Sequence, residues 1–518
     1  MPPIPHSFNS TLRHVAGTVL IILAAFPLCV RAAPPSFAES AELRDLPERW
    51  APLLGEFLVP GVAVGVIKDG KVHAVATFGH RDAALSRPVT SETMFYIASV
   101  TKTYVASAFA VLAADGRIRL DDPVRKYLPR FTLPDAALAE RVTLRQLLSH
   151  EPGISAFPIV LLDAYTGEID DDRYYQWLAK AQVAGRVSYS NVHYTLLGRV
   201  LEAVTGKPWG AALDELVLKP AGLNRTTASA SRLYADTDHA SPLRVTPALA
   251  FEATPQRKTD ATMHAAGGMG ASISDALGYL AWHLGDGHLD GRPGGKPARR
   301  AELVREMRTQ QAALEKPRGS IRVTTGFGLG WQVGSFGKHP FVAHSGGYPG
   351  AVAYYAMLPS KRAGIVILMN AGQSAGALAD VIAIDLLNRL SGESLAPELL
   401  TNYRQRMRPE VQKLKAEPMV RPDNRLTTAQ LTAPVAALAG EYVNPLWGTL
   451  RLTADQDGLR LRLGQLPLNF TSAEAGVVKL ADEPLSGQAL TLVPGMEGGK
   501  ARATLATREW GDAVFERR

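Results

Sequence analysis

Cysteine is almost absent from this chain of 518 residues, whose only one is Cys29. Because Cys29 lies at the end of the apolar N-terminal stretch, the rest of the sequence contains no thiol. This excludes a disulfide framework, a cysteine nucleophile and a thiolate zinc site beyond that stretch. The twelve histidines form no H-E-x-x-H pair. We therefore predict neither a metal nor another cofactor.

The sequence also lacks an apolar run of the roughly 20 residues that a membrane-spanning helix needs. Its N-terminal apolar segment, residues 15–28, follows Arg13 and precedes the small-residue pattern Val30-Arg31-Ala32. A basic residue, a short apolar core and small residues are the parts of a secretory signal peptide. We expect residues 1–32 to be a signal peptide cleaved after Ala32, which leaves a periplasmic or secreted protein without a stable membrane anchor.

A strong charge imbalance is absent too, since the formal net charge is only +7. Basic residues gather at 292–308 and 404–415 without the interleaved aromatic side chains that stack on bases. We therefore predict a small-molecule or peptide substrate and no nucleic-acid partner. The length exceeds what one ordinary core fills, so several domains are expected.

The order of the expected elements indicates an α/β domain over residues 36–394. Strand-like segments at 61–68 and 71–78 flank Asp69-Gly70, which is typical of a tight hairpin. Residues 103–290 have a mostly helical pattern. Strands are expected again at 327–333, 341–345, 351–358 and 364–369, with a helix after them at 375–390. This order predicts an antiparallel sheet assembled from both ends of the segment, flanked by helices, with a helical lobe inserted between.

The last part of the sequence follows another pattern. Residues 395–430 are charged and interrupted by proline, and we expect a linker there with a helix at 397–415. Strictly alternating segments at 449–453 and 459–463 flank Asp457-Gly458, and short strands are expected near Val477, Ala489, Ala501 and Ala513. This pattern predicts a small all-β, barrel-like domain over residues 431–518.

Ser99-Val100-Thr101-Lys102 is the strongest chemical signal. Strand formers precede Ser99 and helix formers follow at 104–114, so Ser99 is expected at a helix N-terminus. Lys102 then lies one turn later on the same face, within reach of the serine oxygen. Lysine becomes a useful base only when burial or a neighbouring cation depresses its pKa. Alone, the pattern equally fits an N-cap serine followed by a surface lysine.

Tyr189-Ser190-Asn191 is a second candidate element, in a loop before the apolar helical stretch 194–204. A tyrosine hydroxyl passes protons when a neighbouring cation lowers its pKa, and an asparagine amide both donates to and accepts from an amide substrate. The alternative is a turn with a core tyrosine and an asparagine cap.

His344-Ser345-Gly346-Gly347 is the third element, at the end of an expected strand. Glycines there let the backbone approach a ligand closely. The N–H of Gly347 would join that of Ser99 as an oxyanion hole. His344 would supply a donor or, when protonated, a cation, in which case KM should rise as the pH passes the pKa of His344. The alternative is a structural histidine.

S-x-x-K, Y-x-N and H-x-G in this order resemble the serine β-lactamase and penicillin-binding-protein superfamily, specifically the class C β-lactamase-like serine hydrolases (peptidase family S12). Flanking segments at 147–154, 266–269 and 327–331 strengthen the resemblance. The resemblance implies a two-lobe fold with Ser99 as the acylated nucleophile and Lys102 as its proton acceptor. It further implies that Tyr189 shuttles protons and that Asn191 holds the substrate amide.

The third element departs from the class C β-lactamases, in which it typically begins with lysine. His344 resembles instead the D-aminopeptidase and D-alanyl-D-alanine carboxypeptidase branches. The C-terminal β domain resembles the lipocalin-like modules that some members append. The resemblance therefore favours an exported serine hydrolase of D-amino-acid-containing peptides or related amides, with cell-wall peptide among the candidate substrates.

Several alternatives stay open at this point. One is β-lactamase or carboxylesterase activity within the same family, and another is a non-catalytic cell-wall-binding or receptor protein with the same fold. Gly372-Gln373-Ser374-Ala375-Gly376 also fits the G-x-S-x-G nucleophile elbow of α/β-hydrolases. An elbow serine needs a later histidine, and none follows His344, so we interpret Ser374 as a turn residue.

Overall fold

The computed structural model describes residues 36–41, 43–246, 248–287, 297–372, 375–393, 425–431, 433–456, 458–495, 500–507 and 509–518, with isolated positions between 394 and 424. The expected signal peptide, most of the expected linker with its helix, and Ser374 lie outside the described residues. Those three expectations stay predictions.

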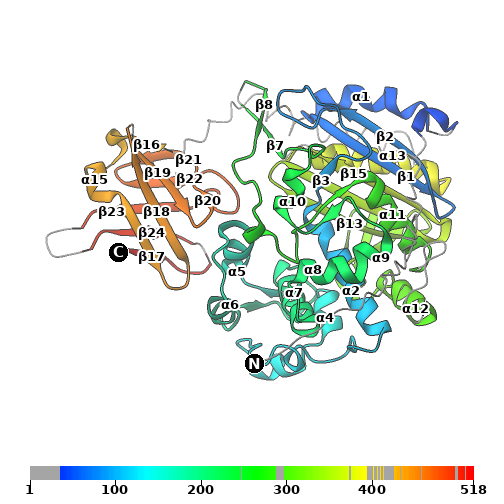
Figure 1. The fold of residues 1–518 in the computed structure, drawn as a ribbon, viewed down its shortest axis with the longest axis horizontal. Helices are drawn as coiled ribbons and strands as arrows, with labels where there is room; N and C mark the ends of the chain where they lie inside the picture. Colours follow the sequence, from blue (N-terminus) through cyan, green and yellow to red (C-terminus); the bar gives the residue numbers. More distant parts are fainter. Residues whose placement is uncertain are drawn as a thin grey trace, which may run out of the picture. The chain divides into compact units, whose positions relative to one another are not determined.

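A central antiparallel sheet is built from two distant parts of the chain. Its strand order is β10-β11-β12-β13-β14-β15-β1-β2. Val62 in β1 lies opposite Met369 in β15, so the first hairpin pairs with the late strands, as predicted (Figure 1). The bounds are β1 Gly61–Lys68, β2 Lys71–Gly79, β10 Ala312–Arg318, β11 Arg322–Phe327, β12 Gln332–Phe336, β13 His339–Tyr348, β14 Ala351–Leu358 and β15 Ala363–Met369.

Helices cover both faces of this sheet because its central strands are apolar on both sides. Ile365 and Ile367 of β15 pack in a core with α1 (Leu46–Glu56) and α13 (Ala375–Ser391). Their neighbours Val366 and Leu368 point to the other face and pack with α2 (Thr101–Ala114) and α11 (Ile273–Leu284). The first part of α2 therefore lies directly against the sheet.

The helical lobe follows α2 in the chain and contains α7 (Asn191–Thr205), whose N-cap Ser190 accepts from the Val192 N–H. The other helices and strands between α2 and β10 are α3 Ala136–Arg141, α4 Leu144–Leu148, α5 Phe157–Leu161, α6 Asp171–Leu178, α8 Trp209–Leu213, α9 Lys219–Ala221, α10 Ala230–Ala235, α12 Pro297–Met307, β4 Ile154–Ser155, β5 Gln182–Val183, β6 Thr226–Thr227, β7 Leu243–Val245, β8 Phe251–Ala253 and β9 Gly270–Ser272. β3 (Met94–Tyr96) pairs with β9 just before α2.

The C-terminal residues form a separate, nearly closed barrel-like sheet, drawn in orange to red in Figure 1. The predicted hairpin is confirmed, since β18 (Gly448–Asp455) pairs with β19 (Gly458–Leu463). The remaining elements are β16 Arg425–Leu426, α15 Val435–Leu438, β17 Gly440–Asn444, β20 Leu466–Pro467, β21 Phe470–Glu474, β22 Val477–Leu480, β23 Ala489–Val493, β24 Arg502–Leu505 and β25 Ala513–Arg517. The predicted fold class is thus confirmed in both of its parts.

One predicted strand is wrong. The segment 327–333 is not continuous, because β11 ends at Phe327 and β12 begins at Gln332. Gly330 between them has φ +79°, and a Cβ there would lie 2.6 Å from Ala106 of α2. The chain therefore turns where it meets α2, and only a glycine allows both the backbone conformation and the close approach.

No helix among the described residues has the length and apolar character needed to span a membrane. Within the same residues, no group of three or more histidine, aspartate or glutamate side chains is arranged to hold a metal ion.

Candidate active site

Ser99 lies on a sharp turn between β3 and α2. Residues Ala98–Val100 form a short 3-10 turn that continues directly into α2, so Ser99 sits at the helix N-terminus, as predicted. Ala98 has φ +45°, a left-handed conformation that costs a residue with a Cβ about 1 kcal/mol or more. The hydroxyl of Thr101 donates to the Ala98 carbonyl at 2.7 Å and helps to hold this turn.

Lys102 follows one helical turn later and is 0 % exposed. Its Nζ lies 3.2 Å from Ser99 Oγ and 2.7 Å from Asn191 Oδ1, and it also donates to the Ala266 carbonyl. Burial lowers the pKa of Lys102 well below its ordinary value. Removing an ammonium from water is costly without an acidic partner, so the neutral amine is favoured.

The three contacts of Lys102 determine which way a proton can move. Asn191 Oδ1 and the Ala266 carbonyl can only accept, so each takes one N–H of the amine. A neutral amine has two hydrogens and one lone pair. The lone pair therefore faces Ser99 Oγ, the only one of the three partners that can donate. This is the geometry of a base next to a nucleophile.

Tyr189 completes this group from the other side. Its hydroxyl hydrogen-bonds with Ser99, and its ring centroid lies 4.9 Å from Lys102 Nζ. Although 36 % of Tyr189 is exposed, its hydroxyl points inward to Ser99, where burial raises its pKa and the bond with Ser99 partly offsets the rise. The premise of a lowered tyrosine pKa is therefore wrong, since Lys102 is not a cation that would stabilise a phenolate.

Asn191 is the first residue of α7 rather than part of the loop before it. Its side-chain oxygen is engaged by Lys102, which leaves the NH2 of the same amide to donate to a substrate carbonyl.

The strand β13 brings the third element to Ser99. A Cβ on Gly346 would lie 2.1 Å from the Ile97 carbonyl oxygen and 3.1 Å from the Ser99 nitrogen, so only glycine permits this contact. A Cβ on Gly347 would meet nothing within 4 Å. Because successive residues of a strand point to opposite faces, this open space lies on the face of β13 away from the Gly346 contact with Ser99.

His344 differs from its expected role. It is buried, and its Nδ1 donates to the Ser345 carbonyl at 2.7 Å. Burial lowers the pKa of His344 to about 3. In the neutral ring the proton is on Nδ1, so Nε2 is an acceptor. The expectation of a cation is therefore wrong at neutral pH, and the one N–H of the neutral ring is engaged by the Ser345 carbonyl.

A cavity of about 500 Å³ opens from this strand on the side of α13. Ser345, Gly346 and Gly347 line it together with Arg318 and Arg322 of the β10–β11 hairpin. Arg322 is paired with Asp380 and lies over the Tyr354 ring at 5.1 Å. Because Asp380 also lines the cavity, Arg318 is the cation there that is not part of this pair.

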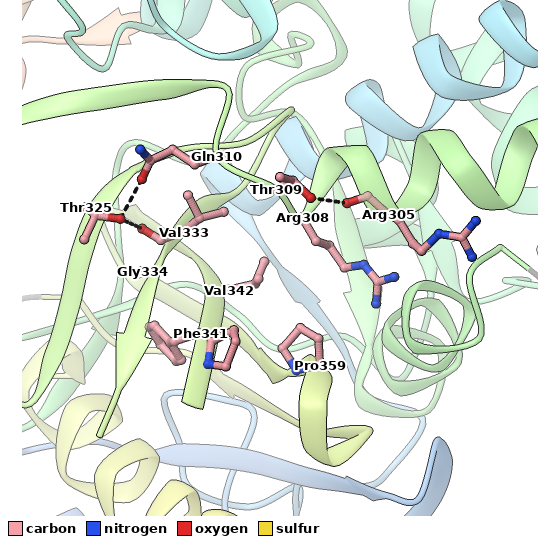
Figure 2. A pocket seen from close by; sticks show the side chains of 11 residues that line it. Arg305, Arg308, Thr309, Gln310, Thr325, Val333, Gly334, Phe341, Val342 and Pro359 are labelled. Carbon is pink, nitrogen blue, oxygen red and sulfur yellow. Dashed lines mark hydrogen bonds between the residues drawn. The ribbon is translucent and has the colours of Figure 1, made fainter. Parts of the chain in front are cut away.

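A second cavity, of about 460 Å³, is lined by none of the predicted site residues. Figure 2 shows its polar wall, in which the Thr325 hydroxyl bonds to Gln310 and to the Val333 carbonyl. Arg305 and Arg308 at its rim are both paired with Asp286. We therefore assign the chemistry to the group around Ser99.

Comparison with known proteins shows the family of the chain. A sequence model of one protein family, described as Beta-lactamase, matches residues 51–388. The chain belongs to the Beta-lactamase family. Its members are serine hydrolases that act on small molecules or peptides.

Individual relatives in this family carry different names. The chain is 29% identical over 359 residues to penicillin-binding protein 4 of Amycolatopsis lactamdurans, which covers 67% of this chain and 89% of that protein. It is 31% identical over 201 residues to a β-lactamase of Escherichia coli (strain K12), covering 38% and 52%. It is 28% identical over 230 residues to a putative D-alanyl-D-alanine carboxypeptidase of the same strain, covering 41% and 53%. The matched part of the chain thus spans about half of the length of each of the last two relatives.

The fold itself is similar to a solved structure of the octameric penicillin-binding protein homologue from Pyrococcus abyssi. The TM-score is 0.57 at 22% identity, over 91% of this chain and 99% of that one. The structural similarity covers most of the chain, and at this level of sequence identity it shows a shared fold only.

The structure brings together six of the eight predicted residues of this Beta-lactamase-family site. Ser99, Lys102, Tyr189 and Asn191 meet through direct contacts, the ring of His344 lies 6.1 Å from that of Tyr189, and Gly346 closely approaches the Ser99 nitrogen. Ser345 and Gly347 lie in the same strand as His344 and Gly346 and line the cavity on the α13 side. Sequence reasoning missed the Ala266 carbonyl, which fixes Lys102 through its backbone and so leaves no side-chain signal. It also missed His193 in the first turn of α7, because a lone histidine beside an apolar helical stretch carries no signal of its own.

Proposed function

We propose that this chain is a serine hydrolase that works through an acyl-enzyme on Ser99. The observation that carries the proposal is the 3.2 Å contact between Ser99 Oγ and the Nζ of a fully buried Lys102 whose two N–H groups are already engaged. A buried neutral amine in this geometry takes the serine proton as the oxygen attacks.

Acylation then follows from the residues present. The Ser99 proton moves to the lone pair of Lys102 while Oγ bonds to the carbonyl carbon of the substrate. The carbonyl electron pair moves to its oxygen, which the N–H groups of Ser99 and Gly347 would bind. When the C–N bond breaks, the leaving nitrogen takes the proton from Lys102 by way of the Tyr189 hydroxyl, which touches Ser99.

Deacylation reverses the same proton path. A water molecule gives its proton to Lys102 through Tyr189, and its oxygen bonds to the ester carbon. The ester C–O bond to Ser99 breaks, Ser99 recovers a proton, and a carboxylic acid is released. Tyr189 remains a neutral phenol at rest, which suits a group that relays a proton without storing a charge.

The substrates that we propose are D-amino-acid-containing peptides or related amides. Asn191 offers an NH2 to a substrate carbonyl, and Arg318 and Arg322 line the cavity beside Gly347. Of the two, Arg322 is already paired with Asp380, so the Arg318 guanidinium is the group that suits a peptide whose leaving residue ends in a carboxylate. The relative named putative D-alanyl-D-alanine carboxypeptidase supports the same substrate class.

The test compares four substrates on purified protein: nitrocefin, a p-nitrophenyl ester, a D-amino-acid p-nitroanilide and an acyl-D-Ala-D-Ala peptide. We expect turnover of the last two and labelling of Ser99 by a fluorophosphonate, both lost in Ser99→Ala. Faster turnover of nitrocefin would favour a β-lactamase instead. If no substrate is turned over and no probe labels Ser99, a non-catalytic binding protein is the better account.

We also propose that the protein is exported, on the sequence pattern of residues 1–32 alone. Intact-mass measurement after expression of the full chain in a Gram-negative host tests this. Recovery from the periplasm with Ala33 as the first residue is expected, and an uncleaved protein in the cytoplasm would contradict it.

A further inference from the structure

Two buried histidines beside Tyr189 take no part in the chemistry proposed above. His150 follows α4 and is 1 % exposed, and His193 lies in the first turn of α7 and is 0 % exposed. The two ring centroids are 5.2 Å apart, and the His150 ring lies 4.7 Å from that of Tyr189. The segment 147–154 strengthened the family resemblance without receiving a role.

Backbone donors fix the proton positions on both rings. The N–H of Ile154 donates to Nε2 of His193 at 2.9 Å, so this nitrogen carries the lone pair. A neutral His193 therefore has its proton on Nδ1. The N–H of Ser190 donates to Nδ1 of His150 at 3.2 Å, so a neutral His150 has its proton on Nε2.

The contact between the rings agrees with both assignments. Nδ1 of His193 lies 2.9 Å from Nδ1 of His150, and one of these two nitrogens must donate. Only His193 has a proton at that position. The chain of donors thus runs from Ile154 through His193 to His150, where the Ser190 N–H also arrives.

Both rings are neutral at ordinary pH. Burial lowers the pKa of His193 to about 3 and that of His150 well below its usual range. Burial is the largest cause of the lowered pKa of each ring. Protonating Nδ1 of His150 would direct its N–H at two other donors, so the geometry opposes it too.

We propose that His193 and His150 are positioning residues that hold the Tyr189-Ser190-Asn191 segment against Ser99. The chain of hydrogen bonds ends on the backbone of Ser190, which lies between Tyr189 and Asn191. The ring of His150 also packs on Tyr189. His150 itself has φ +60°, so its turn directs the ring inward beneath Tyr189. This inference rests on the proposed function, because it concerns the residues that relay protons at Ser99.

Two substitutions at position 193 separate positioning from simple packing. His193→Asn puts an amide NH2 where Nδ1–H was, so it still donates to His150 but no longer accepts from Ile154. His193→Gln puts an amide oxygen where Nε2 was, so it keeps the bond from Ile154 but loses the donor to His150. Each variant removes the ring and retains one of its two bonds.

The two variants should differ in which property they lose: His193→Gln should lose acylation rate, and His193→Asn should lose thermal stability. His193→Gln should lower the rate constant of Ser99 acylation by roughly tenfold at unchanged binding of the probe, the value of about one hydrogen bond. His193→Asn should acylate within about threefold of the wild-type rate. It should nevertheless melt at a lower temperature, because the Ile154 N–H is left buried without a partner. Equal losses in both variants would overturn the proposal.

His150 provides a second pair. Asparagine tolerates the left-handed conformation and presents an acceptor where Nδ1 was, so His150→Asn should stay within about threefold of wild type. His150→Leu should lose at least tenfold in acylation. His73→Asn on β2 serves as the control, since His73 contacts Ser40 and is far along the sheet from β13.

A measurement that needs no activity completes the test. In the full chain labelled with ring-15N histidine, we expect an unprotonated Nε2 on His193 and an unprotonated Nδ1 on His150 at pH 7. The two variants to asparagine identify the signals. The opposite tautomers, or a charged ring, would overturn the proposal. If the wild-type protein is not acylated by any probe, the proposed function fails, and the tautomers alone then decide whether this hydrogen-bond chain exists.

Discussion

At the scale of single residues, the chemistry depends on a lysine that folding makes neutral. Lys102 lies on a helix that is buried almost all round, and burial is the cause of its lowered pKa. The same burial that makes the amine a base also costs folding free energy, because the unfolded lysine is charged and solvated at pH 7. Reactivity and stability are therefore opposed at this position.

Replacing Lys102 with methionine tests this opposition through the pH dependence of stability. The pKa of Lys102 is lower in the folded protein, so between that pKa and about 10.4 the unfolded chain binds one more proton. Stability of the wild type therefore rises with pH in this window. We expect the melting temperature of Lys102→Met, relative to wild type, to be highest at pH 7 and to decrease toward pH 10.

The exposed Lys361 supplies the matched control, and Lys361→Met should show no such trend. An unchanged pH slope in Lys102→Met would mean that the amine keeps its proton on folding. The same variant should lose Ser99 acylation by roughly 100-fold or more, the usual contribution of a general base.

The pH dependence of KM tests the state of His344. Because burial lowers the pKa of His344 to about 3, the ring stays neutral from pH 5 to pH 8. KM for an acyl-D-Ala-D-Ala peptide should therefore be flat over this range. His344→Asn is the matched variant, since its amide can still donate to the Ser345 carbonyl. A rise in KM near pH 6.5 that disappears in this variant would restore the imidazolium role.

At the scale of elements, the site is the meeting point of a helix start, a second helix start and a strand. Ser99 opens α2, Asn191 opens α7, and Gly346 lies in β13. The three elements come together because β13 packs directly on the turn before α2, at a contact that a methyl group would fill. Precision at the site therefore depends on a glycine that does no chemistry.

Adding one methyl group at Gly346 should separate these elements. A Cβ there would lie 2.1 Å from the Ile97 oxygen, so the strand or the turn must move by about an ångström. Displacements of that size cost on the order of 100-fold in rate. We expect Gly346→Ala to reduce fluorophosphonate labelling of Ser99 by roughly this factor, with a loss of unfolding free energy of about 1–3 kcal/mol.

Gly347→Ala is the comparison, because nothing lies within 4 Å of the added Cβ. Its melting temperature should equal that of wild type. If Gly346→Ala is equally stable and equally reactive, the close approach of β13 to Ser99 is not required.

The sequence predicts these elements well where local pattern decides them. The hairpin at Asp69-Gly70 and the helix after Ser99 have strong local signals, and the structure contains both. The break at Gly328–Trp331 could not be predicted, because it comes from contact with α2 across more than two hundred residues. The same limit applies to the bond from Lys102 to the Ala266 carbonyl, since every residue has a backbone oxygen.

The protonation states of the site residues could not be predicted from the sequence either. A lysine and a histidine suggest cations, and a tyrosine near a cation suggests a lowered pKa. Burial reverses each of these expectations, since Lys102 and His344 lose protons and Tyr189 keeps its own. Residue types thus predicted the members of the site, while their charges depend on the packing around them.

At the scale of the whole molecule, the C-terminal sheet contacts the helical lobe close to the site. The Gln465 N–H donates to the Thr166 carbonyl at 2.9 Å, at the end of the helical turn Leu162–Thr166. That turn carries Tyr165, whose ring stacks at 5.6 Å on Tyr348 of β13. The C-terminal sheet therefore supports the turn that packs on Tyr348, the residue directly after Gly347 in β13.

Glu168 is the residue through which this support is best tested. Its carboxylate accepts from the Thr449 N–H of β18 at 2.7 Å. Glu168→Ala removes the acceptor and should lower the unfolding free energy by about 1–3 kcal/mol. Glu168→Gln keeps an oxygen at the same place and should cost less than half as much. Equal values from urea unfolding of the two variants would show that this bond does not stabilise the protein.

The buried histidines also make a prediction about acid stability. Burial lowers the pKa of His150, His193, His264, His283 and His344. Below about pH 6.5 the unfolded chain protonates these side chains while the folded protein does not, so stability falls as the pH decreases. Asp163 opposes this trend, because burial raises its pKa to about 6 and the folded protein binds its proton first.

Five histidines outweigh one carboxyl group, so we expect the urea midpoint to fall steadily from pH 6.5 to pH 4. His283 is the residue to replace, since it lies on α11 between Tyr279 and Trp331 and has no contact with Ser99 among the described interactions. His283→Phe removes one protonation site and keeps an aromatic ring there, so its midpoint should fall less steeply. A midpoint that is flat in the wild type, or a slope that His283→Phe leaves unchanged, would mean that these rings are protonated in the folded protein as readily as in the unfolded chain.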